Sequence, residues 1–146
     1  MLRVAIVFFF LINIACADSD TRVITFLQEP GGEVLVFEAD KQLVKKLPVW
    51  DPELADPPLG IRQALSIAKK KIEHDFPSKE NKLVDIHLRY NFQLNEPTVW
   101  FYAILYTVGS SNSGSSIANK TIYVLMNGDV LDYRVISKSE FGSMFK

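Results

Sequence analysis

Two short apolar runs near the start of the chain predict a β-hairpin. Val23–Leu27 and Glu33–Ala39 are rich in β-branched and aromatic residues, which favour strands. Between them, Glu29-Pro30-Gly31-Gly32 favours a turn. We therefore expect two antiparallel strands joined by this turn.

The clearest periodic pattern predicts an amphipathic helix from Leu59 to about Phe76. Its apolar residues recur at i, i+3, i+4, i+7 and i+11, the spacing of a single helix face. Pro58 suits the first turn of a helix, and Pro77 ends it. We expect Leu65 and Ile72 to be core residues. The predicted apolar face consists of Ile61, Ala64, Leu65, Ala68 and Ile72.

The second half of the chain predicts antiparallel strands. Val84, Ile86, Leu88 and Tyr90 alternate with polar residues, which is typical of a half-buried strand. Val99–Val108 is apolar on both faces, which favours a central strand covered on each side or one that carries a binding surface.

A tight turn is expected near the end of the chain. Asn127-Gly128-Asp129 separates two apolar runs, Thr121–Met126 and Val130–Ile136, and Asn-Gly in this position is a strong hairpin signal. Together these elements predict an α+β fold, in which one amphipathic helix packs on an antiparallel β-meander with an N-terminal β-hairpin added. We expect the helix to cover the sheet face that carries Phe101 and Leu105.

A proline-rich connector links the predicted hairpin to the helix. Pro48–Gly60 contains four prolines, which neither donate to a β-ladder nor sit inside a helix. Trp50 in this connector has two interpretations. It packs on the core as a lid, or it is an exposed contact residue.

The order of these elements resembles the PepSY-like domains of secreted bacterial proteins. The segments PPLGIRQALSIAKKKI, VDIHLRY, VWFYAILYTV and IYVLMNGDVLDYRV carry the resemblance, which covers about residues 57–136. It implies a PepSY-like α+β domain at 57–146. The residue patterns before it add a signal peptide at 1–17 and a hairpin with its connector at 18–56.

The resemblance implies a non-catalytic binding role. PepSY-like domains are thought to restrain peptidases or to bind cell-envelope partners. The related cystatin-like architecture also suggests inhibition, but the Gln-x-Val-x-Gly loop of cystatins is absent. The corresponding turn, after Phe92, reads Gln93-Leu94-Asn95-Glu96-Pro97.

Composition and charge favour one globular domain without a nucleic-acid partner. The chain has 146 residues, 48% of them hydrophobic, and 16 basic against 17 acidic residues give a net charge of −1. A net charge this small creates no electrostatic field that would attract a polyanion. Removal of residues 1–17 would take away Arg3 and leave 15 − 17 = −2.

The first residues resemble a secretory signal. Arg3 precedes nine apolar residues from Val4 to Ile12, and Ala15-Cys16-Ala17 has the small residues of a cleavage site. The run is too short for a membrane span, so we expect export to the periplasm or the medium. Lipid anchoring through Cys16 is the alternative, because Ile14-Ala15-Cys16 partly matches a lipoprotein signal.

No constellation of catalytic or metal-binding residues stands out. The two histidines, His74 and His87, lack a second ligand at the helical spacing of a zinc site, and no phosphate-binding glycine motif occurs. We therefore predict no cofactor and no enzymatic activity. The alternatives are a secreted hydrolase that uses Asp85 and His87, which share a strand face, and a purely structural envelope component.

The sequence also suggests a partner-binding face on the central strand. Trp100, Tyr102 and Tyr106 share one face of Val99–Val108, and aromatic residues with a polar tip suit interfaces. We expect a protein partner to dock there, beside His87 and Arg89 of the preceding strand. The alternative is that the N-terminal hairpin covers these aromatic residues.

The first prediction concerns export. Intact-mass measurement of the protein from its native host should show a mature N-terminus at Asp18, because Ala15 and Ala17 suit cleavage after residue 17. An acylated Cys16 at the N-terminus would replace secretion by lipid anchoring, and retention of Met1 would contradict both.

Overall fold

The computed structural model describes residues 20–29, 31–93, 96–109 and 118–144. The predicted signal segment lies outside these residues. The chain is an α+β protein with two small antiparallel sheets, ordered β1-β2-β6 and β3-β4-β5. The described elements are β1 (Thr21–Gln28), β2 (Glu33–Asp40), α1 (Lys41–Lys46), α2 (Ile61–Asp75), β3 (Asn81–Asn91), β4 (Val99–Val108), β5 (Ala118–Leu125), β6 (Tyr133–Ser137) and α3 (Lys138–Ser143).

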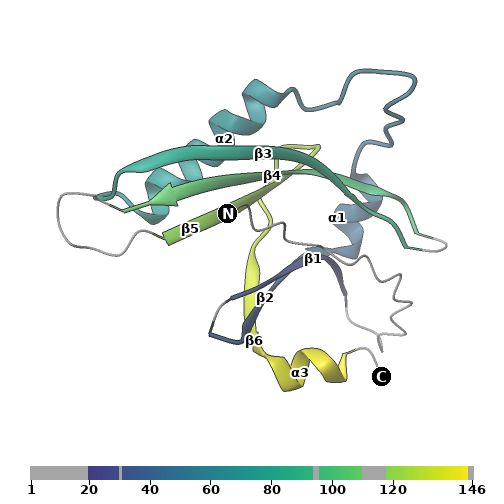
Figure 1. The fold of residues 1–146 in the computed structure, drawn as a ribbon. Helices are drawn as coiled ribbons and strands as arrows, with labels where there is room; N and C mark the ends of the chain where they lie inside the picture. Colours follow the sequence, from purple (N-terminus) through teal and green to yellow (C-terminus); the bar gives the residue numbers. More distant parts are fainter. Residues whose placement is uncertain (1–19, 30, 94–95, 110–117, 145–146) are drawn as a thin grey trace, which may run out of the picture.

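The elements stack in layers around the β3–β4–β5 sheet (Figure 1). α2 packs on one face of this sheet, where Ala64, Ala68 and Ile72 meet β4 and β5. On the other face, β4 and β5 pack against residues of β2 and α1. α3 closes the outer face of the β1–β2–β6 sheet, over Val34 and Val36. The core is therefore split between the two faces of one sheet.

The N-terminal hairpin is confirmed. β1 and β2 pair antiparallel from Thr21↔Asp40 to Gln28↔Val34, with one irregularity between Val23 and Thr25. Gly32 in the connecting turn has a φ of +87°, a backbone conformation that favours glycine.

The single meander predicted for the second half is wrong at its last strand. The tight turn forms, because the Gly128 N–H donates to the Leu125 carbonyl oxygen at 2.9 Å and Gly128 has a φ of +93°. After one isolated bridge, Val124↔Val130, the chain leaves the sheet. β6 then pairs with β2, from Glu33↔Ser137 to Phe37↔Tyr133. An Asn-Gly signal specifies the turn only, whereas the open edge of β2 decides where the strand continues.

The predicted helix is confirmed, but it covers the other sheet face. α2 packs on Tyr102, Ile104 and Tyr106 rather than on Phe101 and Leu105. Phe101 instead belongs to the cluster on the opposite face, with β2 and α1. Within the predicted stripe, Ile72 is fully buried, Leu65 is half-buried and Ile61 is 48% exposed.

A buried arginine joins the hairpin to the other sheet. Arg22 of β1 is 4% exposed, and its guanidinium donates to the Pro97 carbonyl oxygen and to Asn91 Oδ1, each at 2.7 Å. Burial lowers the pKa of Arg22, and the Glu96 carboxylate, 3.7 Å away, opposes that shift. These bonds fix the start of β1 against the turn between β3 and β4.

Replacing Ile72 with Ala should lower the free energy of unfolding by about 2–5 kcal/mol, because Ile72 is fully buried under the sheet. The matched control Ile61→Ala should cost less than about 1 kcal/mol, because half of that side chain is already in water. Urea unfolding of both variants measures the difference. Equal losses would contradict the observed placement of α2.

Candidate functional site

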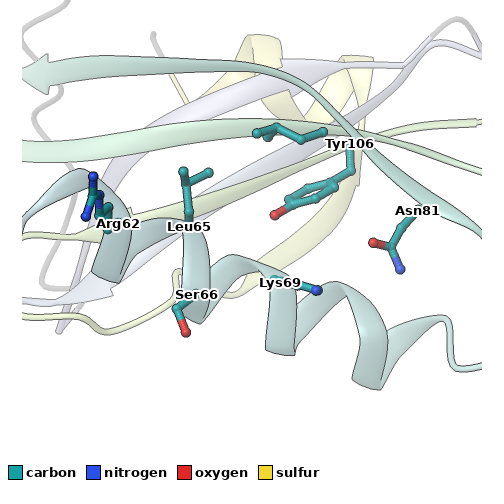
Figure 2. A pocket seen from close by; sticks show the side chains of 7 residues that line it. Arg62, Leu65, Ser66, Lys69, Asn81 and Tyr106 are labelled. Carbon is teal, nitrogen blue, oxygen red and sulfur yellow. The ribbon is translucent and has the colours of Figure 1, made fainter.

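A groove of about 440 Å³ lies between α2 and β3 (Figure 2). Its floor is apolar, and the ring of Tyr106 projects from β4 toward the helix, near Leu65. Leu83 of β3 completes the apolar part. The polar rim consists of Arg62, Ser66, Lys69 and Asn81.

The groove exists because α2 is too narrow for the sheet. A helix is about 10 Å wide and strands lie about 4.8 Å apart, so one helix covers about two strands. α2 covers β4 and β5, and only Ile86 of β3 packs against its core cluster. The helix-side residues Leu83, Leu88 and Tyr90 therefore remain exposed, at 42%, 41% and 52%.

Helical spacing places two cations on the groove side of α2. Arg62 and Lys69 are seven residues apart, so they lie on the same side of the helix, flanking Leu65 and Ser66. Lys69 approaches Glu73 at 3.7 Å, in an exposed pair. Arg62 has no ion pair within the described residues. The rim therefore carries positive charge beside an apolar floor.

An aromatic cluster extends this surface toward the connector. Trp50 meets Trp100 edge-on with a ring separation of 4.9 Å, and Tyr90 lies 5.1 Å from Trp100. The Trp50 indole N–H donates to the Ala55 carbonyl oxygen at 2.8 Å. Trp50 thus packs on Trp100 while remaining half-exposed, which supports its interpretation as a lid in part. Its role as a contact residue stays a prediction.

The aromatic face predicted as a docking surface lies largely in the core. Tyr102 and Tyr106 are each 4% exposed because α2 covers them, and only Trp100 of the three is half-exposed. The Tyr102 hydroxyl donates to the Leu59 carbonyl oxygen at 3.0 Å, so its polar tip is already bonded within the protein. The N-terminal hairpin packs on the opposite face.

His87 and Arg89 do not border those aromatic residues. They stand opposite Ala103 and Phe101 in the β3–β4 register, whereas Tyr102 stands opposite Leu88. Because opposed residues in an antiparallel pair share a face, His87 and Arg89 point away from α2. The irregularity between Leu83 and Asp85 also interrupts the predicted alternation, and Val84 is exposed rather than half-buried.

Asp85 and His87 do come together. The His87 Nε2 atom lies 2.7 Å from Asp85 Oδ2, and both side chains are about half exposed. The residues directly across the ladder are Leu105 and Ala103, which provide no nucleophile. The pair is therefore a polar contact on an open strand.

Burial raises the pKa of three tyrosines, namely Tyr102, Tyr106 and Tyr123. The negative charge of Glu73 raises the pKa of Tyr106 further. Arg89 opposes the shift at Tyr123. Burial therefore favours the neutral phenol at all three positions, and their rings contribute apolar area to the interior.

The described residues hold no cluster of three or more histidine, cysteine or carboxylate side chains that could bind a metal ion. Over the same part of the chain, no helix combines the length and apolar character needed to cross a bilayer.

Comparison of the chain with models of known protein families, with curated proteins and with solved structures finds no match.

Of the residues predicted from the sequence as a partner-binding face, Tyr106 lines the groove. Arg62, Ser66 and Lys69 of α2 also line the groove but are not among the predicted site residues. Their shared helix side was readable from the spacing, and so was the amphipathic nature of β3. The missing information was that α2 would leave β3 uncovered, which depends on the width of the sheet beneath it.

Stability should fall as the pH rises above about 10, the ordinary pKa of tyrosine. The unfolded chain ionises there first, because burial raises the pKa of Tyr106 in the folded protein. In Tyr106→Phe this contribution is gone, so its free energy of unfolding should decline less steeply between about pH 9 and 11. Urea unfolding across this range measures both slopes, and parallel slopes would contradict the burial of Tyr106.

Proposed function

We propose that the protein is a small exported, non-catalytic binding module that holds a segment of a protein partner in the groove between α2 and β3. The observation that carries this proposal is the apolar floor of Leu65, Leu83 and Tyr106 beneath the cations Arg62 and Lys69. Exposed apolar surface with a polar rim is typical of interaction sites.

The chemistry of the groove favours a particular kind of segment. An apolar side chain would fill the floor, and a neighbouring carboxylate would pair with Arg62, which has no ion-pair partner within the described residues. A partner segment with an acidic residue beside an apolar one meets both requirements.

The resemblance to PepSY-like domains adds the class of partner. The helix followed by antiparallel strands at residues 61–125 is consistent with that family's plan, although β6 departs from a simple meander. On this basis we propose that the partner is a peptidase, which the module restrains, or another cell-envelope protein. The half-exposed Asp85–His87 pair has no nucleophile directly across the ladder, which favours binding over hydrolysis.

Site-specific photocrosslinking in the native host tests this proposal. A photoreactive residue at Ser66, on the groove rim, should form a covalent adduct with a partner of one defined mass. The matched control position is His74, which lies seven residues after Ile67 and hence on the helix flank that faces Gly128. Adduct formation at Ser66 should fall about tenfold when Leu83→Asp is added, since a buried interface charge costs more than 1.4 kcal/mol.

Equal adducts at Ser66 and His74 would contradict a role for the groove, and so would an adduct that persists unchanged in Leu83→Asp. Circular dichroism of the variants shows whether the fold is intact. Because Leu83 is 42% exposed, its replacement leaves most of the core contacts in place.

A further inference from the structure

β3 has a free edge that is suited to pairing with another strand. Within the described residues it pairs only with β4, although it runs for 11 residues from Asn81 to Asn91. An edge strand presents backbone N–H and C=O groups that form a template for a further strand. In the middle of β3 the Ile86 N–H donates to Asp85 Oδ1 at 2.8 Å. Leu88 and Tyr90, both exposed, add apolar area beside this edge.

The charges in the middle of β3 are complementary to those of a second β3 strand that runs antiparallel to it. Asp85, His87 and Arg89 share the face that points away from α2, with the acid and the base placed symmetrically about the histidine. Ile86 and Leu88 occupy the helix-side face on either side of the same centre. Arg89 forms no ion pair within the described residues.

From this pattern we propose that the β3 edge binds a second copy of this chain, antiparallel, in a register centred on His87. In that register Asp85 stands directly opposite Arg89 of the second copy, and this ion pair occurs twice by symmetry. Ile86 likewise stands opposite Leu88 of the second copy. Opposite charges and apolar pairs directly across strands are both stabilising.

Other registers lose this complementarity. A shift by one residue places Asp85 opposite Leu88 and puts apolar side chains on the polar face. A shift by two residues toward the C-terminus places His87 opposite Arg89, and a shift by two in the other direction leaves Arg89 opposite Leu83. The second of these shifts also places Asp85 opposite His87, but only the register centred on His87 places Asp85 opposite Arg89.

The proposed dimer has two-fold symmetry, with its axis perpendicular to the sheet. The two β3–β4–β5 sheets join edge to edge, and both α2 helices lie on the same side of the joined sheet. The two grooves then face each other across the paired β3 strands. This inference goes beyond the proposed function, because a groove in one copy can bind a segment whether or not the chain dimerises.

Sedimentation equilibrium over roughly 1–300 µM tests the dimer, since a short strand pairing makes a small interface of modest affinity. The wild-type chain should show a monomer–dimer equilibrium. Arg89→Asp places like charges opposite each other at both symmetric positions and should raise the dissociation constant about tenfold or more. The double variant Asp85→Arg/Arg89→Asp exchanges the charges, restores the opposite pairing and should bring dimerisation back.

Lys70→Asp is the control, because it changes the net charge by the same amount on an exposed residue of α2. It should leave the dissociation constant unchanged. A wild-type chain that is monomeric at every concentration would overturn the proposal. So would a dimer that Arg89→Asp leaves intact, or a charge exchange that fails to restore pairing in a folded protein.

The crosslinking result at Ser66 is independent of this outcome. Arg89 points away from α2, so Arg89→Asp leaves the groove residues unchanged. Loss of the dimer with an intact Ser66 adduct would support both proposals. Dimerisation without a Ser66 adduct would support the pairing of β3 and contradict the proposed binding role of the groove.

Discussion

The structure depends on one strand that is apolar on both faces. Along β4, Tyr102, Ile104 and Tyr106 point to one side, and Val99 and Phe101 point to the other. Each side must be removed from water, because a buried aliphatic or aromatic side chain contributes about 1.5–3 kcal/mol. α2 satisfies one face, and β2 with α1 satisfies the other. The second sheet is therefore required by β4 and is not an independent addition.

Covering one face of β4 with a single helix also leaves part of β3 exposed, and this exposed surface is the one from which function is inferred. α2 has one apolar stripe, and its small residues Ala64 and Ala68 let it approach β4 and β5 closely. This close fit over two strands leaves the helix-side face of β3 open, and the position of β3 at the end of the sheet leaves its edge unpaired. The groove and the free edge thus have a common origin in a sheet that is one strand wider than its cover.

The two sheets are held together by polar as well as apolar contacts. The buried guanidinium of Arg22 in β1 donates to the side-chain oxygen of Asn91 at the end of β3 and to the Pro97 carbonyl oxygen in the β3–β4 turn. Such a group is costly to bury unless it is bonded, so its partners must be in place when the sheets meet. The chain itself also links the two sheets, because it runs from β5 in one sheet to β6, which pairs with β2 in the other. Both features involve residues far apart in the sequence.

Local signals were sufficient for most of the elements. The period of α2, the turn at Gly31-Gly32, the Asn-Gly turn and the two apolar faces of β4 are all properties of neighbouring residues, and each is present in the structure. Tertiary structure decided which face of β4 the helix covers, which sheet β6 joins and how much of β3 stays exposed. Both faces of β4 are apolar, so periodicity alone cannot choose between them. The choice follows from the fit of Ala64, Ala68 and Ile72 against the tyrosine face, while residues of the hairpin and α1 pack against Phe101 on the other face.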